Sequence, residues 1–240
     1  KKDVLEGLTV LFIGTPCQVA GVKNYLRQEY DNLLTVDLIC HGVPSQQSLH
    51  ASLRHAIRDI EPTKVTYLSF RNHAKGDFCL ECRGFKKDGK PFIFERGIAY
   101  SNSYYPAFFF GNSYRNSCYQ CRYAYRQRIS DISIGDFWGL KDEKVHREAD
   151  NGISVVLVNT DKGTAFYALM QADVHSHRQP VEDAIAGNAQ LNAPTRRTGR
   201  TRCFRFLARY CSFEAAFRIT WMDRILKSKM KYCIKKIIRK

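Results

Sequence analysis

Two apolar runs near the start of the chain each end close to a single cysteine. The first, Thr9–Gly14, comes just before Cys17, and the second, Leu34–Cys40, closes on Cys40 itself. The first run is continuously apolar, as parallel strands that are buried on both faces tend to be, and the second is the next strand. Neighbouring parallel strands lie about 4.8 Å apart, and their carboxyl ends open on the same edge of the sheet. Because open α/β sheets bind ligands at that edge, we expect both thiols to lie there.

A helix is predicted after each of these strands. Thr15 has the side chain of an N-cap residue and Pro16 suits the first helical position, so the first helix runs from about Cys17 to Gln28. The second helix is predicted from Gln46 to Ile60, because apolar residues recur there at helical spacing. Two consecutive strand–helix units favour a parallel sheet.

The pattern changes after Pro62 from helical to strand-like. Val65–Phe70 and Phe78–Phe85 have the composition of strands, and a Lys-Lys-Asp-Gly turn leads from the second to Phe92–Glu95. Two further strands and a helix are predicted at 129–136, 152–159 and 163–171. The predicted fold class is therefore mixed α/β (α+β): βα units with parallel strands, an inserted antiparallel sheet and a basic helical C-terminal tail.

The positive charge of the chain is concentrated at its C-terminal end. The formal net charge is +15, but residues 196–240 hold 15 Lys and Arg against two acids, Glu214 and Asp223. This segment carries +13 and leaves only +2 for residues 1–195. We therefore predict two domains, a body over residues 1–195 and a basic helical tail over residues 196–240.

The tail also has the spacing of a single amphipathic helix from Phe217 to Ile238. Apolar residues recur there at steps of three and four, with basic residues on the other faces: Ile219, Met222, Leu226, Met230, Cys233, Ile234 and Ile237. One interpretation is a helix that packs on the body with a solvated basic face. The other is docking to an acidic partner, either a ferredoxin-like electron carrier or an anionic membrane surface. No nucleic-acid partner is expected.

Nine cysteines without a secretory signal favour a reducing compartment. Lys1-Lys2-Asp3 leads straight into a strand-like run, which is not the pattern of a signal peptide. No apolar run approaches the roughly 20 residues that would span a bilayer. We expect a cytoplasmic protein, with peripheral membrane binding only through its tail. The sequence starts without methionine and just before a strand, so we expect a fragment of a longer chain.

Four cysteines are candidate metal ligands. Cys118 and Cys121 have C-x-x-C spacing in a polar, loop-like segment, and Cys17 and Cys40 lie at strand-to-helix turns. Backbone amides and a helix N-terminus at such a turn stabilise a thiolate, whereas most lone cysteines are simply buried apolar residues. Four thiolates without a ligating histidine fit either zinc or an iron–sulfur cluster.

A second C-x-x-C pair leaves a zinc alternative open. Cys79 and Cys82 lie on a predicted strand, where residues three apart point to opposite faces, so we interpret them as structural. Combined with Cys118 and Cys121 they would instead form a zinc site in a non-catalytic docking domain. Single ligands at two turns plus one C-x-x-C pair suit a cluster embedded in an enzyme core.

The segment Asp131–Gly139 ends in the unusual sequence Gly-Asp-Phe-Trp-Gly. Asp131 and Ser133 are predicted on one face of its strand, which is also the pattern of an edge strand with a solvated face. Glycines on either side of the aromatic pair would let the backbone approach a planar ligand. Gly135 and Asp136 are therefore candidate ligand-binding residues.

These segments together resemble the C-terminal domain of the coenzyme F-420 hydrogenase/dehydrogenase beta-subunit family. The resemblance covers roughly residues 8–195, in the family's order, and rests on Gly14-Thr-Pro-Cys17-Gln18, Ile39-Cys40-His41-Gly42-Val43-Pro44-Ser45, Phe70-Arg71-Asn72, Cys118-x-x-Cys121, Asp131–Gly139 and Gly152–Gly163. It implies a flavin- and iron–sulfur-dependent oxidoreductase. Such a module passes electrons between a deazaflavin, or another two-electron donor or acceptor, and iron–sulfur carriers.

The resemblance implies two cofactors, a 4Fe-4S cluster and FAD. The cluster ligands that it implies are Cys17, Cys40, Cys118 and Cys121. FAD is expected beside the cluster, where Arg71 or Arg126 would offset negative charge; the full set of candidate residues is Gly14, Thr15, His41, Gly42, Arg71, Arg126, Asp131, Gly135 and Asp136. The implied partner is an iron–sulfur electron carrier or a partner subunit. No catalytic residue is assigned.

Overall fold

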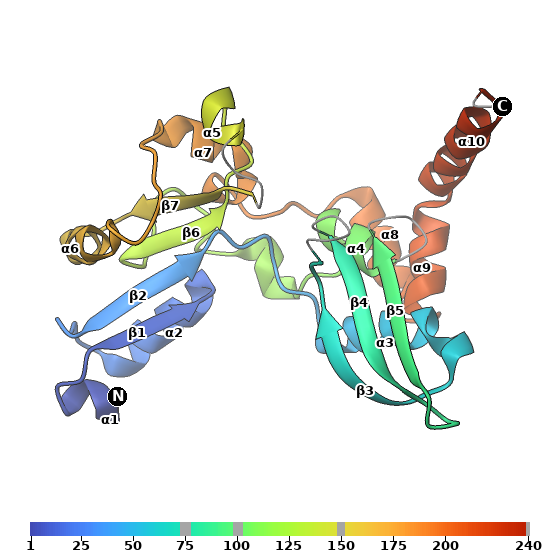
Figure 1. Ribbon diagram of the computed structural model, residues 1–240, viewed down its shortest axis with the longest axis horizontal. Helices are drawn as coiled ribbons and strands as arrows, with labels where there is room; N and C mark the ends of the chain where they lie inside the picture. The colour runs from blue at the N-terminus through green and yellow to red at the C-terminus, as the bar shows by residue number, and fades with distance from the viewer. Residues whose placement is uncertain (73–77, 98–102, 148–151, 239–240) are drawn as a thin grey trace. The chain divides into compact units, whose positions relative to one another are not determined.

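The computed structural model describes residues 1–72, 78–97, 103–147 and 152–238, and it has the mixed α/β fold that the sequence predicts. The chain forms two compact units (Figure 1). Unit 1 comprises Lys1–His41 and Ser117–Thr195, and unit 2 comprises Gly42–Asn116 and Arg196–Lys240. The predicted functional division, a body over residues 1–195 and a tail over residues 196–240, stays a prediction.

Unit 1 is built on a four-stranded sheet with the strand order β1-β2-β6-β7. The strands are β1 (Val10–Gly14), β2 (Leu33–Leu38), β6 (Ile132–Asp136) and β7 (Ser154–Val158). The pairs β1–β2 and β2–β6 are parallel, and β7 is antiparallel to β6. The two cysteine-bearing apolar runs are therefore neighbouring parallel strands, as the sequence predicts.

Short helices surround this sheet. They are α1 (Lys2–Leu5), α2 (Pro16–Leu26), α5 (Glu143–Arg147), α6 (Asp161–Met170) and α7 (Val181–Gly187), with short 3-10 turns η3 (Asn116–Gln120) and η4 (Ala189–Leu191). Buried Val4, Leu26 and Leu33 form a core that α1 and α2 share with the sheet. The sequence predicts α2 and α6 within a few residues, but it does not predict α5 or α7, which are too short to show a clear period.

The two faces of the unit 1 sheet differ in chemistry. Residues paired in the register share a face, and one face is aliphatic except for Asp136 and Ser154 at its end: Leu11, Ile13, Leu34, Val36, Leu38, Ile132, Ile134, Val156 and Val158. The opposite face carries Thr35, Asp37 and Ser133, and all three are almost completely buried. Polar side chains are therefore enclosed on one side of a sheet whose other side is mostly aliphatic.

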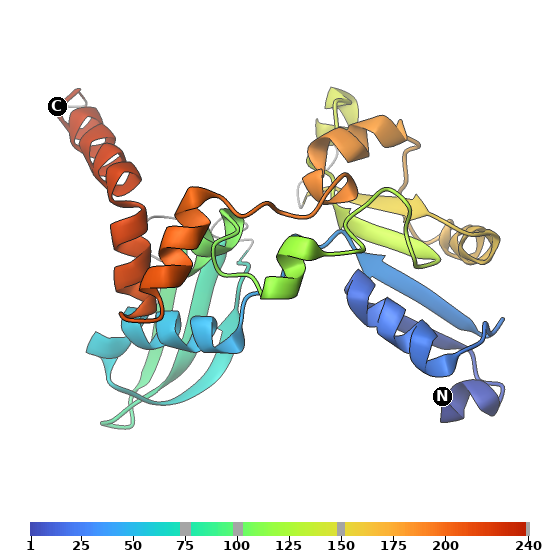
Figure 2. The same ribbon diagram turned by 180° about the vertical axis from the view of Figure 1, so that it is seen from behind.

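Unit 2 contains the inserted antiparallel sheet that the sequence predicts, with the strand order β3-β4-β5. The strands are β3 (Pro62–Ser69), β4 (Cys79–Lys86) and β5 (Pro91–Gly97). Helix α3 (Gln46–Ala56), which η1 (Arg58–Ile60) follows, lies across one face of this sheet (Figure 2). Leu53 of α3, α4 (Tyr104–Phe109) and the strands share a core around Leu80 and Cys82.

Three C-terminal helices complete unit 2: α8 (Gly199–Leu207), α9 (Phe213–Thr220) and α10 (Met222–Ile238). The prediction of one amphipathic helix over Phe217–Ile238 is wrong, because α9 ends and α10 begins on either side of Trp221. Trp221 is buried with Phe204, Phe213 and Phe217 in a second core. This core holds α9, whereas Leu226 and Met230 of α10 are exposed.

No helix in the described part of the chain is long and apolar enough to cross a membrane.

Candidate functional site

Cys17 lies in the first turn of α2, directly after β1. Thr15 precedes the helix, and its backbone N–H donates to Gln18 Oε1 at 2.8 Å. The Thr15 hydroxyl lies 3.2 Å from the Cys17 sulfur, and Cys17 is exposed. A thiol at a helix N-terminus, beside a hydroxyl that can donate to it, is in an environment that stabilises a thiolate.

Cys40 follows β2 at a position equivalent to that of Cys17. Gly14 pairs with Asp37 in the register, so each cysteine lies three residues beyond a paired position. The N–H of Ile39 still donates to Ile134 O at 2.8 Å, which extends the pairing with β6 as far as the residue before Cys40. Cys40 is partly buried. Both thiols therefore follow the carboxyl ends of neighbouring parallel strands.

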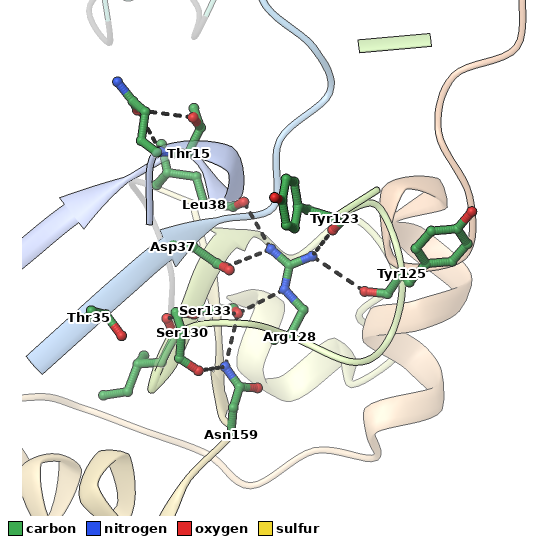
Figure 3. Close-up of polar contacts among 12 residues, drawn as sticks. Thr15, Thr35, Asp37, Leu38, Tyr123, Tyr125, Arg128, Ser130, Ser133 and Asn159 are labelled. Atoms are coloured by element: carbon green, nitrogen blue, oxygen red, sulfur yellow. Dashed lines mark hydrogen bonds and ion pairs between the residues drawn. The ribbon is translucent and has the colours of Figure 1, made fainter. Parts of the chain in front are cut away.

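Arg128 connects the end of β2 with the loop that follows Cys121. Its side chain is 2% exposed and its guanidinium donates to five acceptors (Figure 3): Asp37 Oδ1 at 2.6 Å, Ser133 Oγ at 3.0 Å, Tyr123 O at 3.1 Å, Leu38 O at 3.2 Å and Tyr125 O at 3.4 Å. The sequence pattern does not predict this ion pair. One side chain thus connects the backbone just before Cys40 with the backbone just after Cys121.

The ion pair between Arg128 and Asp37 is enclosed by protein. The Asp37 side chain is 0% exposed, and its second oxygen, Oδ2, is buried without a hydrogen-bond partner among the described residues. Removing a carboxylate from water is costly unless its oxygens are satisfied. Arg128 offsets this cost at Oδ1, and Oδ2 could accept a hydrogen bond from a further donor.

The four predicted cluster ligands all belong to unit 1. Cys118 lies in η3, and Cys118 and Cys121 are partly buried. Among the described residues, however, no three His, Cys, Asp or Glu side chains are close enough together to hold a metal ion. The side chains of Cys17, Cys40, Cys118 and Cys121 are therefore not arranged as a ready-made ligand set, and their assignment as ligands stays a prediction.

Cys79 and Cys82 are placed as the sequence interpretation expects. Both lie on β4, and they are 3% and 0% exposed. Cys82 packs in the core of unit 2, and burial raises the pKa of its thiol. Neither residue is in the unit that contains Cys118 and Cys121. An apolar environment keeps a thiol protonated and makes it a poor metal ligand.

Asp131 joins the two central strands of unit 1 to α6. Its Oδ2 accepts from the backbone N–H and the hydroxyl of Thr35 at 2.8 and 2.7 Å, and its Oδ1 accepts from the hydroxyl of Thr160 at 2.8 Å. Burial would raise the pKa of Asp131, but the hydrogen bonds from Thr35 and Thr160 and the charge of Lys162 outweigh it, so the pKa is lowered. Asp131 is therefore a buried carboxylate that links β2 to the start of α6 through hydrogen bonds from Thr35 and Thr160.

The strand β6 is not an edge strand with a solvated face. It lies between β2 and β7, and Asp131 and Ser133 are 2% and 0% exposed. Asn159, at the end of β7, donates to Ser130 O and to Ser133 Oγ, both at 3.1 Å. These hydrogen bonds satisfy the polar side chains inside the protein, which is why the alternating pattern of this segment does not indicate solvent.

Several of the predicted flavin residues are engaged with the protein in unit 1. A Cβ atom at Gly14 would lie 3.1 Å from the Phe12 ring, and one at Gly135 would lie 3.0 Å from Ile39 Cβ, so both glycines have close protein neighbours. Arg126 donates to Asn192 Oδ1 at 3.1 and 3.3 Å.

His41 and Asp136 also belong to unit 1. Burial lowers the pKa of His41, and the negative charge of Asp136 opposes that shift. The two side chains therefore interact electrostatically at the carboxyl edge of the sheet, where both are predicted to contact flavin.

Arg71 and Gly42 belong to unit 2. The guanidinium of Arg71 lies over the Phe78 ring, 4.9 Å from its centroid. Gly42 has a φ of +136°, and a Cβ atom there would lie 2.5 Å from the Tyr114 ring, so only glycine fits. The predicted flavin residues thus fall in both units, and the assignment stays a prediction.

Sequence reasoning missed Thr35, Asp37, Asn159 and Thr160, which complete the buried polar network. A signal for two of them is present in Leu-Leu-Thr-Val-Asp-Leu, the sequence of β2. Thr35 and Asp37 are two residues apart in an otherwise apolar strand, so they share one face and need partners there. The identity of those partners is not encoded locally, because Asp131 and Arg128 lie about 90 residues further along the chain.

The comparisons with known proteins agree with the motifs at this edge. Residues 7–184 match the family described as the C terminus of the coenzyme F420 hydrogenase/dehydrogenase beta subunit. The chain belongs to this family. A solved chain that is similar to it comes from the F420-reducing [NiFe] hydrogenase complex of Methanosarcina barkeri, with 17% identity and a TM-score of 0.39. The match covers 76% of this chain and 60% of that one, and no curated protein matches.

Membership of the F420 hydrogenase/dehydrogenase beta-subunit family places the chain among redox proteins and indicates a role in electron transfer. The matched region includes all of the predicted cluster cysteines and all of the predicted flavin residues. It ends before α8, so the C-terminal helices of unit 2 lie outside it.

Proposed function

We propose that this chain is a flavin- and iron–sulfur-dependent oxidoreductase module. It would pass electrons between a two-electron donor or acceptor, such as a deazaflavin, and one-electron iron–sulfur carriers. The observation that carries the proposal is the family match over residues 7–184, which contains the cysteines that follow β1 and β2. When bound, FAD would supply the exchange between two-electron and one-electron steps.

The proposed cluster ligands are Cys17, Cys40, Cys118 and Cys121. Two features of the fold support them. The parallel pairing of β1 with β2 brings the backbone before Cys17 and Cys40 to one sheet edge, and the Arg128 guanidinium binds backbone carbonyls two residues from Cys40 and from Cys121. The four thiols do not form a ready-made ligand set in this structure, so under this proposal they would come together when iron and sulfide are loaded.

The proposed FAD site consists of Gly14, Thr15, His41, Gly42, Arg71, Arg126, Asp131, Gly135 and Asp136. Backbone amides near Gly14 and Gly42 would approach phosphate, and Arg71 or Arg126 would offset its charge. Asp131 would act indirectly, since both of its oxygens already accept hydrogen bonds from threonines. The partner would be an iron–sulfur carrier or another subunit, and the compartment would be the cytoplasm.

Anaerobic purification with metal and flavin analysis tests the cluster. We expect brown protein with about four iron and four sulfide per chain, and loss of most iron in Cys40→Ser and Cys121→Ser. Cys203→Ser is the matched control, because Cys203 is in unit 2 and exposed, and it should keep its iron. Colourless protein with stoichiometric zinc would instead support the non-catalytic docking domain.

The flavin assignment has a separate test. Arg71→Ala and Arg126→Ala should release FAD while the circular dichroism spectrum stays unchanged. Arg54→Ala is the control, since Arg54 is exposed at the end of α3 and outside the proposed site. Unchanged FAD occupancy in both variants would remove these two residues from the site.

A further inference from the structure

The segment 196–213 of unit 2 has an unusual charge pattern. It contains six arginines and no aspartate or glutamate. The family match ends at residue 184, so the electron-transfer role of the family does not account for this segment. Arg200 forms an ion pair with Asp223 of α10.

Helix α8 presents several of these arginines on its outer side. Thr201 and Phe204 face the core and are 0% and 3% exposed. The opposite side lines a shallow hollow of about 190 Å³, together with one arginine that precedes the helix and one that follows it: Arg197, Arg202, Arg205, Phe206 and Arg209. These five residues and Tyr210 are named the arginine face.

Part of the arginine face is fixed in position. Arg197 and Arg205 both donate to Asn116 Oδ1, at 2.8 and 2.6 Å, and Arg205 also donates to Tyr114 O at 2.8 Å. The guanidinium groups of Arg202 and Arg209 form no hydrogen bond or ion pair within the described part of the chain. Two anchored arginines therefore stand beside two whose donors are available to a ligand.

The spacing of these charges is unfavourable for the helix itself. Arg202 and Arg205 are three residues apart on α8, so like charges are neighbours on the helix surface, and Arg209 follows in the turn after the helix. No acid of the segment offsets them. An anionic partner would offset this repulsion. Guanidinium groups bind carboxylates with two parallel hydrogen bonds.

Two exposed aromatic side chains adjoin the arginines. Phe206 and Tyr210 are 59% and 76% exposed, and their ring centroids lie 5.3 Å apart. Arginine, tyrosine and phenylalanine are enriched at protein–protein interfaces. The hollow is smaller than the roughly 300 Å³ of typical small-molecule pockets, and it is shallow. The shape and the residue types favour a protein surface over a buried small ligand.

We propose that the arginine face docks an acidic segment of a partner protein, in which carboxylates bind Arg202 and Arg209 and an apolar side chain packs on Phe206 and Tyr210. This inference does not depend on which cofactors the chain holds. It also places the docking site on the arginine face and not on α10, which the tail's charge pattern by itself would favour as the docking helix.

Fluorescence anisotropy with a labelled peptide of alternating glutamate and phenylalanine tests the proposal. We expect binding to the whole chain, and at least tenfold weaker binding to Arg202→Glu/Arg209→Glu. The matched control is Lys227→Glu/Lys229→Glu on α10, which changes the net charge by the same amount at exposed positions. That control should weaken binding less than twofold. Equal losses in both variants would show general electrostatic attraction and overturn the proposal.

Two further outcomes would also overturn it. Absence of binding to the unsubstituted chain at low salt is one. The other is displacement of the peptide by inorganic pyrophosphate at concentrations far below those of free glutamate, which would make this a phosphate site. Phe206→Ser should weaken peptide binding at physiological salt, where charges are screened over about 8 Å, and an unchanged affinity would contradict the aromatic part of the interface.

Discussion

Arg128 and Asp37 form an ion pair that is almost completely buried, although they lie 91 residues apart in the sequence. The same guanidinium binds the carbonyls of Leu38 and Tyr123. Leu38 is two residues before Cys40, and Tyr123 is two residues after Cys121. The relative position of these two proposed ligands is thus set by a residue that no metal-binding motif includes.

Replacement of Arg128 by methionine should destabilise unit 1 strongly. Loss of one partner from a buried ion pair leaves an uncompensated charge and costs about 3–5 kcal/mol. Urea denaturation, followed by hydrogen exchange in β2 and β6, measures the effect. Arg122→Met is the control, because Arg122 is exposed in the same loop and should change stability by less than about 0.5 kcal/mol.

The double variant Asp37→Leu/Arg128→Met distinguishes the ion pair from simple packing. Replacement of both charges by apolar groups removes the buried carboxylate, so we expect it to be more stable than Arg128→Met alone. If the double variant were as unstable as the sum of the single ones, the two residues would not be coupled.

The lowered pKa of Asp131 makes unit 1 sensitive to acid. A carboxyl whose pKa is lower in the folded than in the unfolded chain contributes stability above its unfolded pKa of about 3.9, and this is lost as the pH falls through the folded value. Asp131→Asn should cost about 1–3 kcal/mol at neutral pH, because the Thr35 donors lose a charged acceptor. Its stability should then fall less steeply than that of the parent chain as the pH is lowered.

Urea midpoints between pH 6 and pH 3 provide this measurement. Asp31→Asn is the control, since Asp31 is exposed and its substitution removes no side-chain hydrogen bond to the described residues. An unchanged acid slope in Asp131→Asn would show that other groups dominate the acid response.

The order of the sheet strands shows what the sequence can and cannot predict. Continuous apolar runs are sufficient to predict β1 and β2 as parallel neighbours, and alternation with a turn is sufficient for β4 and β5. The break at Trp221 is not predicted, because apolar spacing continues through it. The break becomes clear only when the aromatic core that holds Phe217 and Trp221 is seen.

The site shows a different limit. The cysteines can be placed at the sheet edge from local pattern, because strand ends and caps are local features. The burial of Asp131 cannot be predicted in this way, since a polar residue on a strand has the same pattern in solvent and in a satisfied network. Its partners Thr35 and Thr160 are brought to it by strand pairing and by the start of α6.

The thiols should fall into two classes of reactivity. Cys17 and Cys203 are exposed, whereas Cys79 and Cys82 are buried, and burial raises the pKa of Cys82. In native, metal-free protein, iodoacetamide at pH 8 should alkylate the exposed pair first and the buried pair only after unfolding, as read by mass spectrometry. Rapid labelling of Cys82 would mean that the core of unit 2 opens readily.

Helices α9 and α10 should differ in how much they contribute to the stability of unit 2. Phe217 is 0% exposed in the core around Trp221, so Phe217→Ala should cost about 3–5 kcal/mol. Leu226→Ala is the matched substitution on α10, and at 53% exposure it should cost under about 1 kcal/mol. Urea denaturation followed by circular dichroism reports both. A large effect of Leu226→Ala would indicate that α10 is covered in solution.

The connection between the units bears on the order of folding. Residues 42–116 of unit 2 are inserted between β2 and β6 of unit 1. The two ends of this insertion contact each other: Pro44 forms a β-bridge with Tyr114, and the N–H of Arg115 donates to Val43 O at 2.9 Å. Before this closure forms, the pairing of β2 with β6 must close a loop of about 90 residues, but afterwards it closes a connection of only about 20, residues 39–42 and 116–131. The antiparallel sheet of unit 2 is local in sequence and forms without such a closure. Closure of this segment therefore shortens the loop that the unit 1 sheet must close, and in refolding amide protection in β4 and β5 should precede amide protection in β2 and β6.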